Sequence, residues 1–513
     1  MCALIRYNRA RMNLCEPLRA HAENTPEKTA LFCLDAKISY KALDESTTAL
    51  ARWFLDRGLR PKDRVALHWS NSIEAVQLLY AIFKAGLIAV TINTRLKPEE
   101  IGYILNHSEA RMCFSEPTLA PQAENAGGTC PVFTELPRFE LTEAPAALAP
   151  VDPDQPAILL YTSGTTARPK GVTHTHRSLT EASIIMAREA SKGAWGLGET
   201  SLCILPIMHA GGLIVAVVFS VYQGSSLVLL PRFDPAAVLD TIERFECTHT
   251  VCMPALWQFI VGEQERFPRR VSCLRSAAAG GDAVPVALQD RFRTFFGIAL
   301  QEGYALTESI PVSFNPVHAI RAGSMGLAAD GVELRIVGLD GQDVPDGEPG
   351  ELLVRSPGTC IGYWNDPDAT RAALRDGWLH TGDLASRDAD GYYWFRGQKK
   401  EIIIRAGSNI SPQEVEEALY RHPAVREIGI IGQPDPVYGE VVVAFVVLRQ
   451  GQTADDVELG QFARQHLADY KVPEKFVFLE DLPKGPTGKV FRRALKEMLS
   501  AARATASTFS QKL

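Results

Sequence analysis

A loop rich in hydroxyl groups, glycine and lysine is the first stretch of the sequence whose residue types could bind an anion. It reads TSGTTARPKG over residues 162–171 and follows the apolar run AILLY. Inward-pointing N–H groups and hydroxyls would form an anion-binding nest, to which a lysine adds a point charge. Taken alone, the loop is equally well explained as a solvated turn. The residues available for anion binding are Thr162, Ser163, Gly164, Thr165, Thr166 and Lys170.

This loop is not a standard nucleotide P-loop, whose pattern is G-x-x-x-x-G-K-[ST]. Gly164 and Lys170 are in register with the pattern, but Pro169 replaces its second glycine and Gly171 replaces its serine or threonine. If the loop holds a triphosphate, it must do so in a different way.

Six further motifs follow in order along the chain. They are LPIMHAGG (205–212), QEGYALTES (301–309), GSMG (323–326), WLHTGDL (378–384), GQKKEIIIRAGSNISPQEVE (397–416) and PKGPTGK (483–489). Together with the first loop, their order and spacing resemble the acyl-CoA synthetase branch of the adenylate-forming enzymes, along almost the whole chain. The resemblance implies a reaction in two steps. A carboxylate attacks the α-phosphorus of ATP to give acyl-AMP and pyrophosphate, and the thiol of coenzyme A then forms the thioester and releases AMP.

The resemblance also implies which residues contact the phosphates. Residues 162–166 and Lys170 would grip the β- and γ-phosphates of ATP. Thr307 would contact the α-phosphate, and Glu308 would be a ligand of Mg²⁺, a hard cation that prefers carboxylate and phosphate oxygens. Positive charge is needed here because the carboxylate and the triphosphate repel each other.

The nucleoside contacts follow from the same resemblance. Tyr304 would stack on adenine, with Gly303 and Ala305 beside it, and Asp383 would accept hydrogen bonds from both ribose hydroxyls. Gln398 occupies the position at which the family has an arginine that helps to hold the ribose. For Asp383, the alternative reading is a residue that caps a turn after a glycine.

The remaining matches concern the acid, the thiol and domain movement. Lys489 matches the catalytic lysine, in a Gly/Pro-rich loop that must move into place. His209 matches a residue beside the acyl pocket, although a satisfied core histidine is nearly as good an explanation. Lys400 matches the hinge between the lobes, and Ala406 and Gly407 match the path of the pantetheine arm.

Four positions depart from the family pattern. Ala167 and Ala305 replace glycines, and alanine disfavours positive φ, so the first of these changes could stiffen the phosphate loop. Asp282 stands where a small neutral residue is usual, and no role can be assigned to it. Gln398 keeps hydrogen-bond donors but lacks the arginine's charge, which nearby Arg396 could supply.

Two patterns suggest a metal site only weakly. Cys247, His249 and Cys252 have metal-ligand spacing but no second half-site, so buried strand thiols are expected instead. His174 and His176 alternate as residues on a strand edge do. The sequence therefore predicts no metal besides Mg²⁺.

Composition sets the class of protein. The chain has 513 residues, 46% of them hydrophobic, and a formal net charge of −7, which argues against a nucleic-acid partner. Ten scattered cysteines suit a reducing cytoplasm, and no secretory signal is visible. The most apolar stretch is interrupted by Gln223, Gly224, Ser225 and Ser226, so no transmembrane segment is expected, while peripheral membrane contact stays open.

The elements that must position these motifs alternate between strand and helix. RVALHW (64–69) reads as a strand, IEAVQLLYAIFKAG (73–86) as a helix capped by Asn71 or Ser72, and LIAVTI (87–92) as another strand. We therefore expect an α/β fold, with a large N-terminal lobe of parallel and mixed sheets flanked by helices.

Near residue 400 the pattern changes to that of a small, mobile α+β domain. We expect an N-terminal AMP-binding domain over residues 1–398 and a C-terminal domain over 399–513 that carries the catalytic lysine. A helix should begin at Pro412, with Ser411 as its cap and Glu414 completing a capping box.

The function that follows is that of an ATP-dependent carboxylic acid–CoA ligase using ATP, Mg²⁺ and coenzyme A. A fatty or other apolar monocarboxylic acid is favoured as the substrate, because the chain after Gly212 is hydrophobic. The sequence also shows no obvious arginine that would bind a second carboxylate. Three alternatives stay open: a stand-alone enzyme that loads an acyl carrier protein, an oxygen-dependent oxidation of the adenylate, and a non-enzymatic binder.

Overall fold

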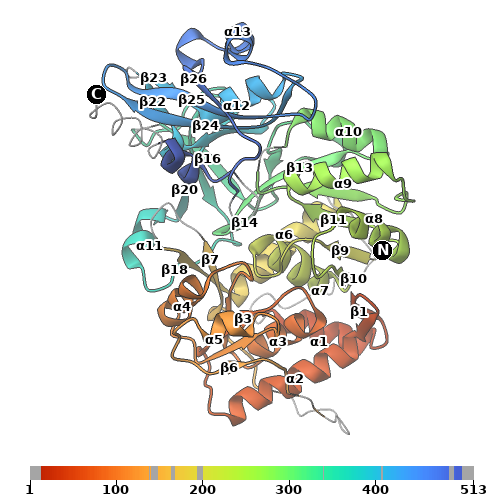
Figure 1. Cartoon of the computed structure of the whole chain (residues 1–513). Coiled ribbons are helices and arrows are strands. Elements are labelled where there is room, and N and C mark those ends of the chain that lie inside the picture. The colour runs from red at the N-terminus through yellow and green to blue at the C-terminus, as the bar shows by residue number, and fades with distance from the viewer. Residues whose placement is uncertain are drawn as a thin grey trace. The chain divides into compact units, whose positions relative to one another are not determined.

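The computed structural model describes residues 13–137, 139, 148–162, 168–192, 200–282, 284–338, 340–405, 408–484 and 490–499. The chain forms two compact units (Figure 1). Unit 1 comprises Met1–Leu334 and Leu353–His380, and unit 2 comprises Arg335–Leu352 and Thr381–Leu513. The sequence predicts a domain boundary between residues 398 and 399, where a mobile C-terminal domain should begin. That boundary concerns movement, and it stays a prediction.

A seven-stranded sheet forms one layer of unit 1. Its central strands are parallel, whereas β8 runs antiparallel to β7 and β18 runs antiparallel to β8. Parallel strands that are buried on both faces consist of continuous apolar runs, which is why apolar and polar residues do not alternate within these strands. The strand order is β18 (Gly362–Tyr363), β8 (Lys170–Thr175), β7 (Pro156–Thr162), β4 (Ile88–Thr91), β3 (Arg64–His68), β5 (Met112–Ser115) and β6 (Val132–Phe133).

A nine-stranded sheet forms the second layer. Six neighbouring strands, from β13 to β1, are parallel, and the sheet is antiparallel at both ends. The order is β15 (Leu327–Ala328), β14 (Ser309–Phe314), β13 (Leu300–Leu306), β12 (Ser276–Ala279), β11 (His249–Cys252), β9 (Thr200–Cys203), β10 (Ser226–Leu229), β1 (Thr29–Cys33) and β2 (Ala36–Ser39).

Helices accompany both sheets. The expected helix at 73–86 is α3 (Ile73–Lys84), and Ser72 is its cap, because the Ser72 side chain accepts a hydrogen bond from the Ala75 N–H. The others in unit 1 are α1 (Cys15–Asn24), α2 (Tyr40–Asp56), α4 (Pro98–His107), α5 (Ala120–Glu124), α6 (His176–Ser191), α7 (Phe219–Gln223), α8 (Pro235–Phe245), α9 (Pro254–Arg266), α10 (Val286–Phe296), α11 (Pro367–Ala373), the π-helix η1 (Gly211–Val218) and the short 3₁₀ helix η2 (Val317–Ala319).

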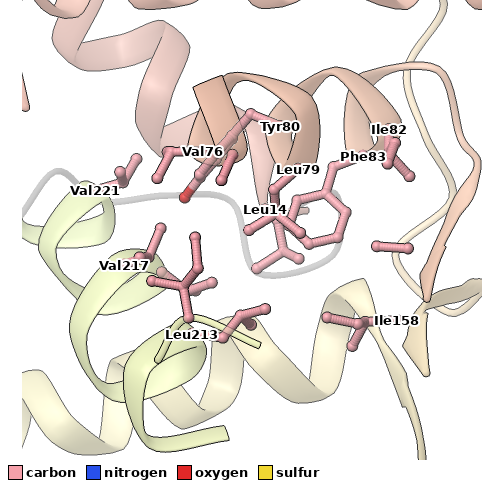
Figure 2. Close-up of a cluster of buried hydrophobic side chains, with 14 of the residues drawn as sticks. Leu14, Val76, Leu79, Tyr80, Ile82, Phe83, Ile158, Leu213, Val217 and Val221 are labelled. Atoms are coloured by element: carbon pink, nitrogen blue, oxygen red, sulfur yellow. The ribbon is translucent and has the colours of Figure 1, made fainter. Parts of the chain in front are cut away.

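The core of unit 1 joins α3 to the π-helix η1. Figure 2 shows Val76, Leu79 and Tyr80 of α3 facing Leu213 and Val217 of η1. These side chains are almost completely buried, and the burial of each contributes on the order of 2 kcal/mol. The packing therefore holds together two segments that lead into candidate site residues, since α3 precedes β4 and η1 follows His209.

Unit 2 contains an α+β core. Its sheet has the strand order β23 (Ser408–Ile410), β22 (Ile403–Arg405), β25 (Gly439–Leu448) and β24 (Val425–Asp435), and β26 (Lys475–Phe478) also pairs with β25. The helices of this part are α12 (Pro412–Tyr420), α13 (Asp456–His466) and the 3₁₀ helices η3 (Lys399–Glu401) and η4 (Asp469–Lys471). A further five-stranded sheet has the order β16 (Glu333–Val337), β17 (Gly350–Arg355), β20 (Trp378–Arg387), β19 (Leu374–Arg375), with β21 (Tyr393–Gln398) paired to β20.

The cap of α12 is not formed as the sequence suggested. Pro412 is the first helical residue, as expected, but the Ser411 side chain makes no capping hydrogen bond. Its hydroxyl instead donates to the Arg396 carbonyl at 2.6 Å, and Glu414 pairs with Lys471. The predicted capping box is therefore wrong, because a neighbouring strand offers the serine another acceptor.

The α/β class, with a large sheet-rich N-terminal part and a smaller C-terminal one, is confirmed. Among the helices of the described ranges, none combines the length and the hydrophobicity that crossing a membrane requires.

Candidate active site

The candidate residues of unit 1 lie at or close to the carboxyl ends of parallel strands, where open α/β sheets bind ligands. Thr162 ends β7, and Lys170 begins β8 directly opposite it in the antiparallel register. The two ends of the phosphate-loop candidate are thus held side by side. Its intervening predicted contacts, Ser163, Gly164, Thr165 and Thr166, and the departure Ala167, lie outside the described residues.

Lys170 and Glu308 are brought together by Tyr363, a residue that the sequence reasoning missed. The Tyr363 hydroxyl donates a hydrogen bond of 2.8 Å to Glu308 Oε1. The Lys170 ammonium lies 5.1 Å from the centre of the Tyr363 ring, within the range of a cation–π contact. Burial, followed by the charge of Glu308, raises the pKa of Tyr363, so the phenol keeps the proton that it donates.

The backbone around Thr307 and Glu308 is fixed from two sides. The buried His174 lies with Nε2 2.7 Å from the Thr307 carbonyl and Nδ1 3.1 Å from the Ser178 hydroxyl. The Cys360 N–H donates to the Glu308 carbonyl at 2.7 Å. Burial lowers the pKa of His174 to about 4, so a neutral imidazole donates from Nε2 to the carbonyl. The turn that carries both predicted phosphate-side residues is thereby tied to β8 and to the segment before β18.

The adenine-side candidates lie on β13. A side chain at Gly303 would be crowded, because a Cβ atom there would approach the Ser313 carbonyl and the Phe314 ring to 3.2 Å. Tyr304, which is half-buried, pairs with Ser313, and Ala305 is exposed. Strand packing therefore explains the glycine whether or not a nucleotide binds.

His209 contacts a residue that follows a strand of the other sheet of unit 1. Its Nε2 is 3.1 Å from the amide nitrogen of Asn93, which follows the carboxyl end of β4, whereas His209 itself follows β9. Burial, followed by the positive charge of Arg95, lowers the pKa of His209. Asn93 was not expected from the sequence, because an asparagine after a strand usually serves a turn.

In unit 2, Asp383 and Gln398 are hydrogen-bonded partners. The two residues face each other in the register of β20 and β21, and Gln398 Nε2 donates to Asp383 Oδ1 at 2.8 Å. Asp383 is only 4% exposed, so its carboxylate is held in one orientation. Gln398, at the position where the family has arginine, thus still donates a hydrogen bond to the Asp383 carboxylate.

Arg396 does not take over that role in this structure. It falls in the register shift between β20 and β21, is exposed, and donates from Nε to the Ser386 hydroxyl at 2.9 Å. Asp282 is exposed as well, and nothing in its surroundings explains the departure. The side chain of Lys400 and the predicted residues Ala406, Gly407 and Lys489 lie outside the described residues.

The two weak metal patterns do not form metal sites. Cys247 and Cys252 are buried free thiols, and His249 bonds through Nε2 to the Ser201 hydroxyl at 2.9 Å. His174 and His176 are both fully buried, and neither lies on a strand edge, because β8, which carries His174, is an inner strand of the sheet and His176 is the first residue of α6. In the parts of the chain that the structure describes, no group of three or more His, Cys, Asp or Glu side chains could hold a metal ion.

Comparison with known proteins identifies the same family along most of the chain. Residues 18–364 match the family model of the AMP-binding enzymes, and residues 414–489 match that of the AMP-binding enzyme C-terminal domain. A sulfoacetate–CoA ligase of Cupriavidus necator is 36% identical, over 93% of this chain and 96% of that protein. A feruloyl-CoA synthase of an Amycolatopsis species is 35% identical, with the same coverage of both chains. A fatty acid–[acyl-carrier-protein] ligase of Streptomyces coeruleorubidus is 32% identical, over 93% of this chain and 94% of that protein.

Solved structures show the same similarity. The ATP-bound MatB of Rhodopseudomonas palustris superimposes with a TM-score of 0.87 at 30% identity, covering 95% of this chain and 99% of that one. The chain therefore belongs to the AMP-binding enzymes and, within them, to the adenylate-forming acyl-CoA synthetase branch, whose members are AMP-forming acid–thiol ligases.

Proposed function

We propose that the protein activates an apolar monocarboxylic acid with ATP and transfers the acyl group to coenzyme A. The observation that carries this proposal is the group formed by Lys170, Tyr363 and Glu308, with Thr307 beside it. A cation, a carboxylate of fixed orientation and a hydroxyl residue gather next to the two ends of the phosphate loop. This is the charge pattern that an attack by one anion on another requires.

The residues present fit a magnesium ion that is bound together with a nucleotide. Glu308 offers a carboxylate that the hydrogen bond from Tyr363 to its Oε1 holds in one orientation. Mg²⁺ is commonly bound by one or two carboxylates together with substrate phosphates and water, so a single protein carboxylate is sufficient. When bound, the ion supplies positive charge to the phosphate oxygens.

Residues of the chain itself bind the rest of the nucleotide and the acid. Lys170 attracts the outer phosphates, and Thr307 contacts the α-phosphate. Asp383, oriented by Gln398, accepts the ribose hydroxyls. Lys489 bridges the carboxylate and the α-phosphate during adenylation.

The second half-reaction uses another face of the C-terminal part of the chain. After the adenylate forms, that part rotates about Lys400. Gly407 then lines the path along which the thiol of coenzyme A approaches the adenylate. The two half-reactions therefore depend on different residues.

The apolar acid is proposed from the segment after His209. The π-helix η1 consists of Gly211, Gly212 and the apolar run LIVAVV, and π-helical turns occur frequently at functional sites. The three relatives are named for sulfoacetate, ferulate and fatty acids, so similarity alone leaves the acid open.

A panel of acids tests the proposal. Purified protein is incubated with ATP, Mg²⁺, coenzyme A and a medium-chain fatty acid, ferulate or sulfoacetate, and pyrophosphate and thioesters are measured. We expect pyrophosphate and a CoA thioester with the fatty acid. A preference for sulfoacetate would contradict the apolar substrate but not the ligase.

The acceptor is tested in the same assay. One relative acts with an acyl carrier protein, which makes a carrier protein the second candidate. Mass spectrometry after incubation with a carrier protein in place of coenzyme A distinguishes the two. An acylated carrier without any CoA thioester would overturn coenzyme A as the acceptor.

A further inference from the structure

We propose that Asn93 fixes the position of the proton on His209, so that the ring offers a neutral Nδ1–H donor to the acyl substrate. This inference rests on the proposed function for the role of His209, but the protonation of the ring follows from the geometry of the free protein. Asn93 is thus a positioning residue that acts through His209.

The orientation of the Asn93 amide is set by its other contact. The Arg95 N–H donates a hydrogen bond of 2.9 Å to Asn93 Oδ1. Rotating the amide by 180° would place its NH₂ group against this N–H, donor against donor. The oxygen therefore faces Arg95, and the NH₂ group must be the atom group that faces His209.

That orientation determines the tautomer of the ring. Asn93 Nδ2 lies 3.1 Å from His209 Nε2, and an NH₂ group can only donate. Nε2 must accept with its lone pair, so the proton of the neutral ring is on Nδ1. Protonation of Nε2 would replace this hydrogen bond with a clash between two donors.

The surroundings favour the neutral ring as well. Burial, followed by the positive charge of Arg95, lowers the pKa of the His209 imidazole. Among the described residues, no carboxylate acts on the ring against these two effects. Burial, the cation and the amide donor all disfavour the imidazolium form.

The Nδ1 side of the ring is available to a ligand. His209 Nδ1 makes no hydrogen bond to the described residues. The atom is also not fully buried, so a ligand can reach it. The backbone holds the residue at both sides, because the His209 N–H donates to the Pro206 carbonyl and the Leu213 N–H donates to the His209 carbonyl. The donor therefore projects from a rigid support.

A neutral donor suits a reaction in which a carboxylate must remain nucleophilic. An imidazolium would bind the free carboxylate most strongly in the ground state and hold its charge away from phosphorus, and ground-state binding does not accelerate chemistry. A neutral N–H orients the acid without neutralising it. The locked tautomer thus serves positioning and not charge stabilisation.

The first test measures the ring directly in the free protein. Protonated and unprotonated ring nitrogens resonate in separate ¹⁵N regions, so selective labelling of histidine reports the tautomer. The His209 signal is identified by its absence from the His209→Gln variant. We expect a protonated Nδ1 and an unprotonated Nε2 at pH 7; a protonated Nε2 would overturn the proposal without any activity assay.

The second test uses Asn93→Asp, which keeps an oxygen for the Arg95 N–H but presents an acceptor to the ring. We expect His209 to become protonated at Nε2 and its pKa to rise. The kcat/KM for the acid should fall about tenfold, with the KM for ATP unchanged, if one orienting hydrogen bond is lost. Asn106→Asp, which places the same charge on an exposed residue of α4, is the control and should match wild type.

The two proposals fail in different ways. A wild-type protein that releases no pyrophosphate with any acid would overturn the proposed function, while the tautomer would still be measured. An Asn93→Asp variant that switches the tautomer but keeps the wild-type kcat/KM for the acid would overturn the role of Asn93.

Discussion

A single hydrogen bond distinguishes Glu308 from an ordinary surface carboxylate. Tyr363 comes from β18, 55 positions further along the chain, and its phenol fixes one oxygen of Glu308. A carboxylate of fixed orientation loses less entropy when it binds a cation than one that rotates freely. Tyr363 should therefore matter to magnesium use because it orients Glu308.

Replacing Tyr363 with phenylalanine tests this residue. Hydrogen bonds to charged groups are worth about 1.5–3 kcal/mol, so we expect pyrophosphate release to fall roughly 10- to 100-fold and the Mg²⁺ concentration for half-maximal rate to rise. Glu308→Gln, which removes the charge itself, should cost more, about 10²- to 10³-fold. A Tyr363→Phe variant with the wild-type Mg²⁺ dependence would contradict the positioning role.

At the scale of elements, the strand pair β20 and β21 presents Asp383 and Gln398 as one unit. Their contact depends on a register that aligns residues 15 positions apart. Glutamine supplies a neutral donor to the carboxylate, whereas arginine would supply a charged and bidentate one. The departure from the family pattern therefore alters the strength of the contact and not its existence.

Gln398→Arg should strengthen nucleotide binding. If the pair faces the ribose, the KM for ATP should fall about three- to tenfold, the range expected for gaining a charge-assisted hydrogen bond, while the KM for the acid stays unchanged. Gln398→Ala, which removes the donor, should shift the KM for ATP in the opposite direction. Equal ATP dependence in all three proteins would show that the pair does not face the nucleotide.

The elements also show what could be predicted from the sequence. The helix α3 was predictable because its start and apolar face are local features, and Ser72 caps it as expected. The capping box at Ser411 failed because a carbonyl distant in sequence competes for the hydroxyl. The roles of Tyr363 and Asn93 could not be predicted, because tyrosine and asparagine are common residues and the partners of these two lie 55 and 116 positions away in the sequence.

At the scale of the whole molecule, the two half-reactions should be separable. Lys489 is proposed to act during adenylation, so Lys489→Ala should nearly abolish pyrophosphate release but still form thioester from preformed acyl-AMP. Gly407→Leu should do the reverse and accumulate the adenylate, because a larger side chain blocks the thiol's path. Both variants must first show wild-type thermal melting. Equal damage to both half-reactions would contradict a rotating C-terminal part.

The stability of the molecule should fall steeply in mild acid because unit 1 buries neutral histidines. His68, His174 and His176 are fully buried, and burial lowers the pKa of His68 and His174 to about 4 and that of His176 to about 3. In the unfolded chain each has a pKa near 6.5. Between pH 6.5 and 4 the unfolded state therefore binds more protons, so the free energy of unfolding decreases as the pH falls through this window.

The contribution of His176 can be isolated by mutation. Both of its ring nitrogens are buried without a hydrogen-bond partner, and the ring packs edge-on against Phe83, so an apolar residue can replace it. At pH 5 its proton uptake on unfolding should cost about 2 kcal/mol of stability. Urea unfolding of His176→Leu at pH 7 and pH 5 should show a pH-dependent loss smaller than that of wild type by about this amount. His318→Leu, the same change at an exposed position, should keep the wild-type difference, and an unaltered pH dependence in His176→Leu would show that the buried ring is not the source.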